Sequence, residues 1–196
     1  MDGKIVPDHH KVLKVVRGDQ AQHWTDDTIR VLFVISTLVT AEAMCGYGHG
    51  PRTAADPRFA SHLDQTSRMM LTMAGGNFPL GAGAHVEATA PAAALRALHD
   101  RGVPILAGAD AGTLGVAHGA SLHRELQLLT EAGLSPAEAL TAATAAPAAR
   151  FGLSDRGRIA PGLTADLMLV DGDPTTDISA TASIYATWRR GTRHNR

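Results

Sequence analysis

The chain has 196 residues, of which 44% are hydrophobic and 19% are charged, and its formal net charge is -1. This composition excludes a coiled coil, a disordered tail and a collagen-like repeat. The chain is long enough to bury a core without disulfide or metal cross-links. Its near-neutral charge argues against a nucleic-acid-binding protein, for which a basic excess is typical.

The single cysteine, Cys45, allows no intramolecular disulfide and no zinc knuckle built from thiolates. No apolar run is long enough to span a bilayer, and the charged N-terminus has no signal-peptide core. We therefore expect a soluble cytoplasmic protein that does not bind membranes. Residues 1–30 differ in composition from the rest, because they contain all of the lysines: Lys4, Lys11 and Lys14. We treat residues 1–30 as an atypical N-terminal segment.

The first elements along the chain are predicted from apolar runs and from glycine and proline. Residues 31–39 form a nearly continuous apolar run rich in β-branched residues, which predicts a buried strand of a parallel sheet. Residues 46–58 are rich in glycine and proline and predict a loop. Residues 61–74 are compatible with a helix, and the glycine-rich stretch 75–84 ends it.

The clearest alternation of helix and strand follows. Residues 91–101 predict a helix that begins at a proline and ends before Gly102. Residues 103–107 predict a short buried strand, and residues 108–112 a loop of small residues with one carboxylate. A further helix over 121–132 is predicted from an apolar stripe at helical spacing, formed by Leu122, Leu126 and Leu129.

The last predicted helix begins with Ser135 as N-cap, Pro136 in the first turn and Glu138 as the third helical residue. It extends to about residue 145, and Pro147 is expected to begin one more turn. Beyond it, short strands are predicted over 157–159, 165–170 and 184–188. We place a domain boundary near 150–155, so that an α/β unit over 31–150 precedes a small all-β unit over 151–196.

Asp110 is the strongest candidate for a functional residue. A carboxylate just beyond a buried parallel strand lies at the carboxyl edge of the sheet, where α/β proteins build their sites. Its small neighbours leave room for a ligand, and it would serve as a metal ligand, a general base or both. The alternative is an aspartate that caps a nearby turn or helix. The position of Asp110 in the sequence does not decide between a functional carboxylate and a capping residue.

Other candidates are histidines and a glutamate near Asp110. His118 precedes the helix over 121–132 and would face the same edge of the sheet and contact substrate, unless it is a solvent-exposed loop residue. His123 and Glu125 are more consistent with a helix face than with metal ligands. His49 and His85 are expected in loops without a partner at ligand spacing. Short motifs for zinc, phosphate or a nucleophilic serine are absent from the sequence.

Three stretches of the sequence together resemble the C-terminal part of the amidohydrolase superfamily, in its imidazolonepropionase-like and prolidase-like branch. Residues 103–111 (VPILAGADA) resemble the eighth barrel strand with its terminal aspartate, and residues 118–144 resemble the last barrel helices. Residues 157–174 resemble the return into a small β-sandwich beside the barrel. The order and spacing match over about residues 100–192, and residues 31–99 are compatible with the seventh strand and its connection.

The resemblance implies a partial (β/α)8 TIM-like barrel, consisting of the last strands and helices, followed by part of a small composite β-sandwich. It also implies a metal-dependent hydrolase of carbon–nitrogen bonds with a small-molecule amide-type substrate and a divalent metal, zinc above all. Of the family's metal ligands, only the aspartate of the eighth strand transfers, to Asp110. The resemblance leaves open whether His9 or His10 stands for the histidine of the sixth strand.

The resemblance covers only the last third to half of such an enzyme. The few parallel strands cannot close an eight-stranded barrel, and one carboxylate cannot hold zinc, which takes three protein ligands and a water in catalytic sites. We therefore expect the isolated chain to be incomplete and inactive. It would be part of a hydrolase, a non-catalytic remnant or interaction module, or a chain that self-associates or pairs with an N-terminal half to rebuild a barrel.

Overall fold

The computed structural model describes residues 33–45, 49–73 and 89–194. Two short strands, β1 (Val34–Ser36) and β2 (Ile105–Ala107), form a parallel two-stranded sheet. Val34 pairs with Ile105, and Ser36 pairs with Ala107. The expected α/β fold is confirmed, and the strand predicted over 103–107 is confirmed as β2.

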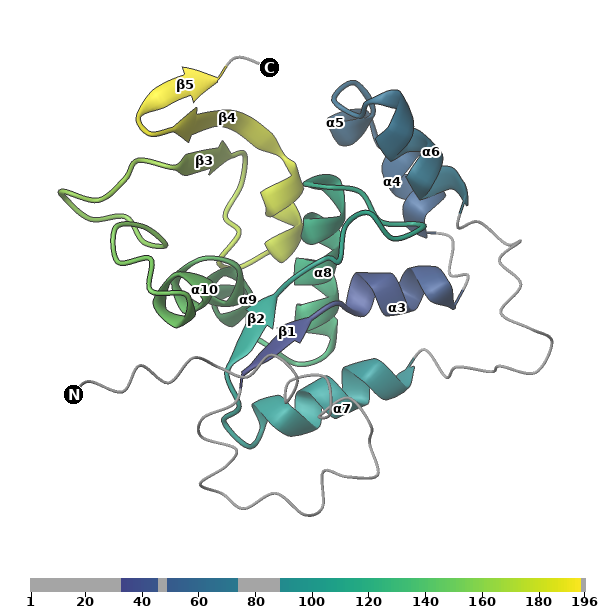
Figure 1. The fold of residues 1–196 in the computed structure, drawn as a ribbon, viewed down its shortest axis with the longest axis horizontal. Helices are drawn as coiled ribbons and strands as arrows, with labels where there is room; N and C mark the ends of the chain where they lie inside the picture. Colours follow the sequence, from purple (N-terminus) through teal and green to yellow (C-terminus); the bar gives the residue numbers. More distant parts are fainter. Residues whose placement is uncertain (1–32, 46–48, 74–88, 195–196) are drawn as a thin grey trace, which may run out of the picture.

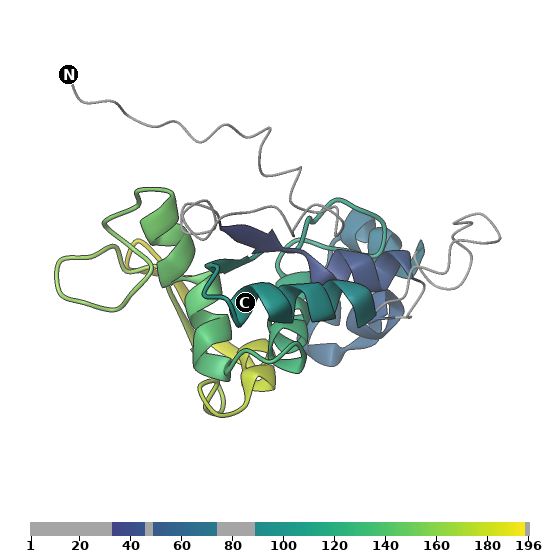
Figure 2. The ribbon, with the colours of Figure 1, turned by 90° about the horizontal axis from the view of Figure 1, so that it is seen from below.

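Helices cover one face of this sheet (Figure 2). They are α8 (Ala120–Glu131) and α9 (Pro136–Ala143), which both contact β2. Helix α7 (Thr89–His99) packs against α8, and α10 (Ala145–Arg150) packs against α9. The main hydrophobic core lies between these elements and includes Leu95, Ile105, Leu126, Leu129 and Ala139.

Two local signals explain why α8 and α9 form where they do. Leu126 and Leu129 are almost completely buried, as the spacing of the apolar residues predicted. Helix α9 begins with a complete capping box: the Glu138 amide donates to Ser135 Oγ at 3.3 Å, and the Ser135 amide donates to Glu138 Oε2 at 2.8 Å. Together these groups satisfy two backbone amides that a helix start leaves without partners.

The prediction of a strand over 31–39 is wrong beyond Ser36. The strand ends there, and helix α3 (Leu38–Met44) begins two residues later. The apolar, β-branched composition favours a strand, but the first turn of α3 is stabilised by a carboxylate from α8, which accepts a hydrogen bond from the Val39 amide. A tertiary contact therefore overrides the local preference.

The prediction of a loop over 46–58 is also wrong for most of its length. Helix α4 (His49–Ala55) and helix α5 (Pro57–Ala60) lie there, and Asp56 caps α5 by accepting from the Arg58 amide. Helix α6 (Gln65–Met73) follows, inside the predicted range 61–74. Gly50 is needed for the contact between α4 and α6, because a Cβ there would lie 2.2 Å from the Leu71 carbonyl oxygen.

A second sheet lies apart from the first (Figure 1). Strands β3 (Leu167–Val170), β4 (Ile184–Arg189) and β5 (Thr192–His194) are antiparallel in the order β3-β4-β5. The 3-10 helix η2 (Ile178–Ala182) joins β3 to β4 and packs on α8. The strand predicted over 157–159 does not form, and β5 was not predicted.

This second sheet keeps much apolar surface exposed. Adjacent residues of a strand point to opposite faces, yet three consecutive residues of β3 are 37–48% exposed: Leu167, Met168 and Leu169. Both faces of β3 are therefore accessible. The domain boundary near 150–155 stays a prediction. Within the residues described, no helix is both long and apolar enough to cross a bilayer.

Because α4 and α6 approach closely, we expect a glycine-to-alanine replacement in α4 to destabilise the fold, although such replacements usually stabilise a helix. Replacing a helical glycine by alanine normally stabilises a helix by up to about 1 kcal/mol. We expect G50A instead to lower the free energy of unfolding by about 1–3 kcal/mol, because the new methyl group meets backbone rather than a flexible side chain. Urea denaturation would measure the change. The exposed R52A in the same helix is the control and should stay within about 0.5 kcal/mol of wild type; equal or greater stability of G50A would contradict the prediction.

Candidate functional site

The carboxyl ends of β1 and β2 lie at the same edge of the parallel sheet, and the segments that follow them meet there. The Gly108 amide donates to the Ser36 carbonyl oxygen at 2.9 Å, which extends the pairing by one residue beyond β2. The Thr40 hydroxyl, from the first turn of α3, donates to the Ala109 carbonyl oxygen at 2.9 Å. Two hydrogen bonds thus hold the backbone immediately before Asp110.

Gly108 is required by this close approach of the two strand ends. A Cβ atom at this position would lie 2.6 Å from Ile35 Cγ2 and 3.2 Å from the Ser36 carbonyl oxygen. A larger residue would push the two chain segments apart. The small residues of this loop therefore serve the packing of the strand ends.

Asp110 lies three residues beyond the end of β2, at this carboxyl edge, and its side chain is exposed. Its backbone has a left-handed φ of 49°, which is uncommon for a residue other than glycine. The Thr113 hydroxyl donates to Asp110 Oδ2 at 3.0 Å, and the Thr113 amide donates to the Asp110 carbonyl oxygen at 3.3 Å. Asp110 therefore combines a local turn contact with a carboxylate at the surface of the edge, and its role in metal binding or catalysis stays a prediction.

His118 is exposed, two residues before α8, on the loop that leads from Asp110. Its charge contributes to lowering the pKa of Asp64, although the main cause of that shift is hydrogen bonding from Ser67. Within the described ranges, hydrogen bonds and ion pairs connect His118 to neither Asp110 nor Thr113. The substrate-binding role of His118 also stays a prediction.

Among the described residues, metal ligands are not gathered around Asp110. Across residues 33–45, 49–73 and 89–194, no group of three or more histidine, cysteine, aspartate or glutamate side chains is arranged to hold a metal ion. His9, His10 and His85 lie outside the described residues. Since a catalytic zinc site takes three protein ligands, the described residues do not form one.

His49 opens helix α4 and does not lie in a loop as expected. Both ring nitrogens are buried and have no hydrogen-bond partner among the described residues. Burial lowers the pKa of His49, and the nearby guanidinium of Arg124 lowers it further. His123, in contrast, has partners for its ring and for one ring nitrogen. The ring stacks on Phe59 at a centroid distance of 5.3 Å, and its Nδ1 lies 3.1 Å from the Thr181 hydroxyl oxygen.

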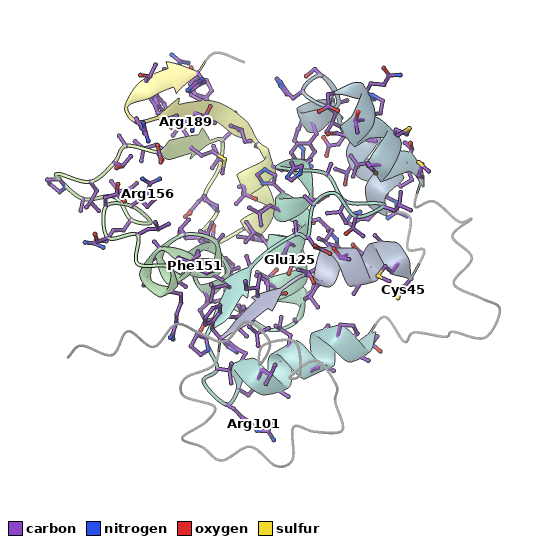
Figure 3. All side chains as sticks on the ribbon, in the orientation of Figure 1. Cys45, Arg101, Glu125, Phe151, Arg156 and Arg189 are labelled. Atoms are coloured by element: carbon purple, nitrogen blue, oxygen red, sulfur yellow. The ribbon has the colours of Figure 1, made fainter. Side chains whose placement is uncertain are left out.

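The residue that sequence analysis undervalued is Glu125, whose exposed fraction is 0%. Its carboxyl group lies between α8, the end of β1 and the first turn of α3 (Figure 3). The Ser36 hydroxyl donates to Oε1, and the Val39 amide donates to Oε2 at 2.7 Å. The signal was present in the spacing, because Glu125 is three residues after Leu122 and four before Leu129, within the buried stripe of α8.

Burial raises the pKa of the Glu125 carboxyl above its ordinary value of 4.5, despite the opposing hydrogen bonds from Ser36 and from the start of α3. A carboxyl whose folded pKa is raised stabilises the fold while it is protonated, and this contribution is lost as pH rises through the folded pKa. The folded chain should therefore lose stability over that range.

We expect E125Q to remove this loss, because a neutral amide of nearly the same shape stays uncharged at every pH. Thermal or urea unfolding at several pH values above 4.5 would give the difference in stability between wild type and variant. The difference should shift in favour of E125Q as pH rises. A difference independent of pH would contradict the prediction.

The chain is similar to known proteins in both sequence and structure. Residues 83–193 match the sequence pattern described as the amidohydrolase family. Imidazolonepropionase from Deinococcus deserti is 36% identical over 107 residues, which cover 53% of this chain and 27% of that protein. Adenine deaminase from Methanoregula boonei is 46% identical over 59 residues, which cover 30% of this chain and 10% of that protein.

Among solved structures, a crystal structure of an amidohydrolase has a TM-score of 0.57 and 24% identity, over 86% of this chain and 37% of that chain. A prolidase complexed with N-methylphosphonate-L-proline has a TM-score of 0.58 and 22% identity, over 88% of this chain and 38% of that chain. These likenesses show a shared fold. The chain spans less than two fifths of each of these two solved proteins. Because the family pattern covers more than half of its residues, the chain belongs to the amidohydrolase family.

Proposed function

We propose that this chain is the C-terminal part of a hydrolase that cleaves carbon–nitrogen bonds other than ordinary peptide bonds in small amide-type substrates. The observation that carries the proposal is Asp110, a surface carboxylate directly beyond the carboxyl end of β2, in a segment that matches the amidohydrolase family. Relatives named imidazolonepropionase and adenine deaminase support the cleavage of carbon–nitrogen bonds other than peptide bonds. The expected location is the cytoplasm.

In this proposal Asp110 is the general base and acid of the reaction. Its carboxylate accepts a proton from the attacking water and passes it to the leaving nitrogen. The exposed position of Asp110 leaves it accessible to a substrate at the edge of the sheet, and the hydrogen bond from Thr113 orients one carboxylate oxygen. His118, on the same loop, would contact the substrate.

The metal of the proposed enzyme is divalent, with zinc as the first candidate. The described residues do not fit a complete site for it, because they bring no three ligand side chains together. Asp110 would supply one ligand, and the others would come from outside the described residues.

We also propose that β1 and β2 with their helices are the last part of a (β/α)8 barrel, and that β3, β4 and β5 are part of a small β-sandwich. The remaining strands would come from the rest of a longer protein, from a partner chain or from a second copy. The exposed apolar residues support this: Ile35 of β1 is 46% exposed and Tyr185 of β4 is 60% exposed. Surfaces of this kind are normally covered in a stable protein.

The second candidate is a non-catalytic interaction module of the same fold. The same exposed apolar side chains of β3 and β4 favour it, because they offer a surface to another protein whether or not Asp110 acts in catalysis. The two candidates differ in the effect expected when Asp110 is changed.

In the longer enzyme that carries the remaining barrel strands, we expect D110N to lower kcat by about 100-fold or more, in the range usual for loss of general acid–base catalysis. Asparagine tolerates the left-handed backbone and still accepts a hydrogen bond from Thr113, so the melting temperature should stay close to that of wild type. H118A should lower kcat/KM. Wild-type turnover by D110N would exclude the proposed role, and unchanged kcat/KM in H118A would exclude substrate binding by His118.

The zinc content of the purified chain distinguishes an incomplete metal site from a complete site formed when chains associate. We expect the purified 196-residue chain to contain far less than one zinc ion per chain, because a single carboxylate binds zinc weakly. Elemental analysis after extensive dialysis, together with the mass in solution, would measure this. Near-stoichiometric zinc would contradict the expectation and favour assembly of a complete site.

A further inference from the structure

We propose that Glu125 is a positioning residue for Asp110, in addition to its role in the stability of the core. The proposal rests on the proposed function only in giving Asp110 a chemical task. Glu125 lies on α8 and does not touch Asp110. It acts through the end of β1 and the start of α3, which hold the backbone immediately before Asp110.

The first connection passes through Ser36, the last residue of β1. The Ser36 hydroxyl donates to Glu125 Oε1, and the Ser36 carbonyl oxygen accepts from the Gly108 amide at 2.9 Å. Ser36 is itself 3% exposed, so its hydroxyl has little access to water as an alternative partner. The side chain and the backbone of one residue thus connect Glu125 to the segment two residues before Asp110.

The second connection passes through the first turn of α3. The Val39 amide donates to Glu125 Oε2 at 2.7 Å, and the next residue, Thr40, donates from its hydroxyl to the Ala109 carbonyl oxygen at 2.9 Å. Thr40 is buried. Because the carboxyl group fixes the turn that carries Thr40, it also determines where the hydroxyl meets Ala109.

Asp110 needs this support because its backbone is held in the left-handed region, with φ at 49°. This conformation is uncommon for a residue with a side chain, although aspartate and asparagine adopt it more readily than most. A backbone of this kind is kept in place by contacts with the surrounding structure. The local contact with Thr113 lies within the loop itself, whereas the bonds at Gly108 and Ala109 tie the loop to the rest of the fold.

The docking of α3 on α8 does not depend on Glu125 alone. Arg124 forms an ion pair with Glu42 of α3 at 2.8 Å, and the guanidinium donates to both carboxylate oxygens of Glu42. The loss of the Glu125 carboxyl should therefore loosen the first turn of α3 and the end of β1 without releasing the helix.

The test is amide hydrogen exchange in the 196-residue chain, followed by NMR or mass spectrometry. The informative amides are Gly108 and Thr113, each compared with amides of α8 and α9 in the same sample. We expect E125A to increase exchange at Gly108 and Thr113 by about tenfold relative to these helices, as the loss of a buried hydrogen-bond acceptor implies. E125Q should restore protection close to that of wild type, because its amide can accept from Val39 and donate to Ser36.

T181A is the matched control. Thr181 of η2 is also a buried polar residue that packs on α8, 1% exposed, and its hydroxyl donates to the Ile178 carbonyl oxygen at 2.8 Å. Its loss should reduce stability without changing the ratio of loop exchange to helix exchange, because this contact lies within η2 and not in the loop. A similar ratio in E125A and T181A would overturn the proposal. Exchange in E125Q as fast as in E125A would overturn it as well.

If E125A does not fold, the T40V variant can still test whether the hydrogen bonds before Asp110 hold the loop. T40V removes the bond to Ala109 and leaves the Glu125 carboxyl in place, so it should increase exchange at Thr113 several-fold while the helices stay protected. Unchanged loop exchange in T40V would also overturn the proposal.

The loop measurement is independent of any activity of Asp110. If D110N leaves turnover unchanged while E125A releases the loop, the catalytic role of Asp110 fails and the structural connection stands. In the longer enzyme, E125A should lower kcat more than it raises KM and E125Q should retain most of the kcat, which a general loss of stability would not produce.

Discussion

The candidate site depends on one buried carboxyl group. Glu125 brings an ionisable side chain into the core, where burial without partners would be costly. The cost is offset because the carboxyl group accepts two hydrogen bonds at the edge of the sheet. One comes from the Ser36 hydroxyl at the end of β1, and the other from the Val39 amide in the first turn of α3. Burial raises the pKa of Glu125, the hydrogen bonds oppose this shift, and the same hydrogen bonds hold the end of β1 and the start of α3 at that edge.

The parts of the fold that were predicted correctly are determined by residues close to one another in the sequence. The capping box of Ser135 and Glu138 and the leucine stripe of α8 each depend on contacts within about two helical turns. Helix α3 could not be predicted in this way, because the group that stabilises its first turn is 86 residues away in sequence. Helix α4 was missed for a similar reason: Gly50 marks a close helix contact with Leu71 instead of a loop.

The same distinction between local and distant contacts applies to the candidate site. A carboxylate immediately after a short apolar strand was sufficient to predict that Asp110 lies at the carboxyl edge, because the path of the chain through β2 determines it. The spacing could not reveal that Thr40 and Ser36 hold the loop, since that requires β1 and α3 to be positioned next to it. Nor could it place His118, whose electrostatic neighbour is Asp64, far away in sequence.

The distribution of burial is consistent with the proposal that this chain is one part of a longer enzyme. The helices that frame Asp110 are well packed, and core residues such as Leu129 and Ala139 are fully buried. The surfaces that would meet further strands are the poorly covered ones, including Ile35 of β1 and Met168 of β3. These elements can hold the Asp110 carboxylate in position by themselves, because the hydrogen bonds that hold the backbone before Asp110 lie within α3, α8 and the two strand ends. They cannot assemble a zinc site from the described residues, because such a site takes three protein ligands and the described residues bring no three ligand side chains together. The position of the proposed base and the binding of the proposed metal are therefore separate properties, and the first can be studied in this chain without the second.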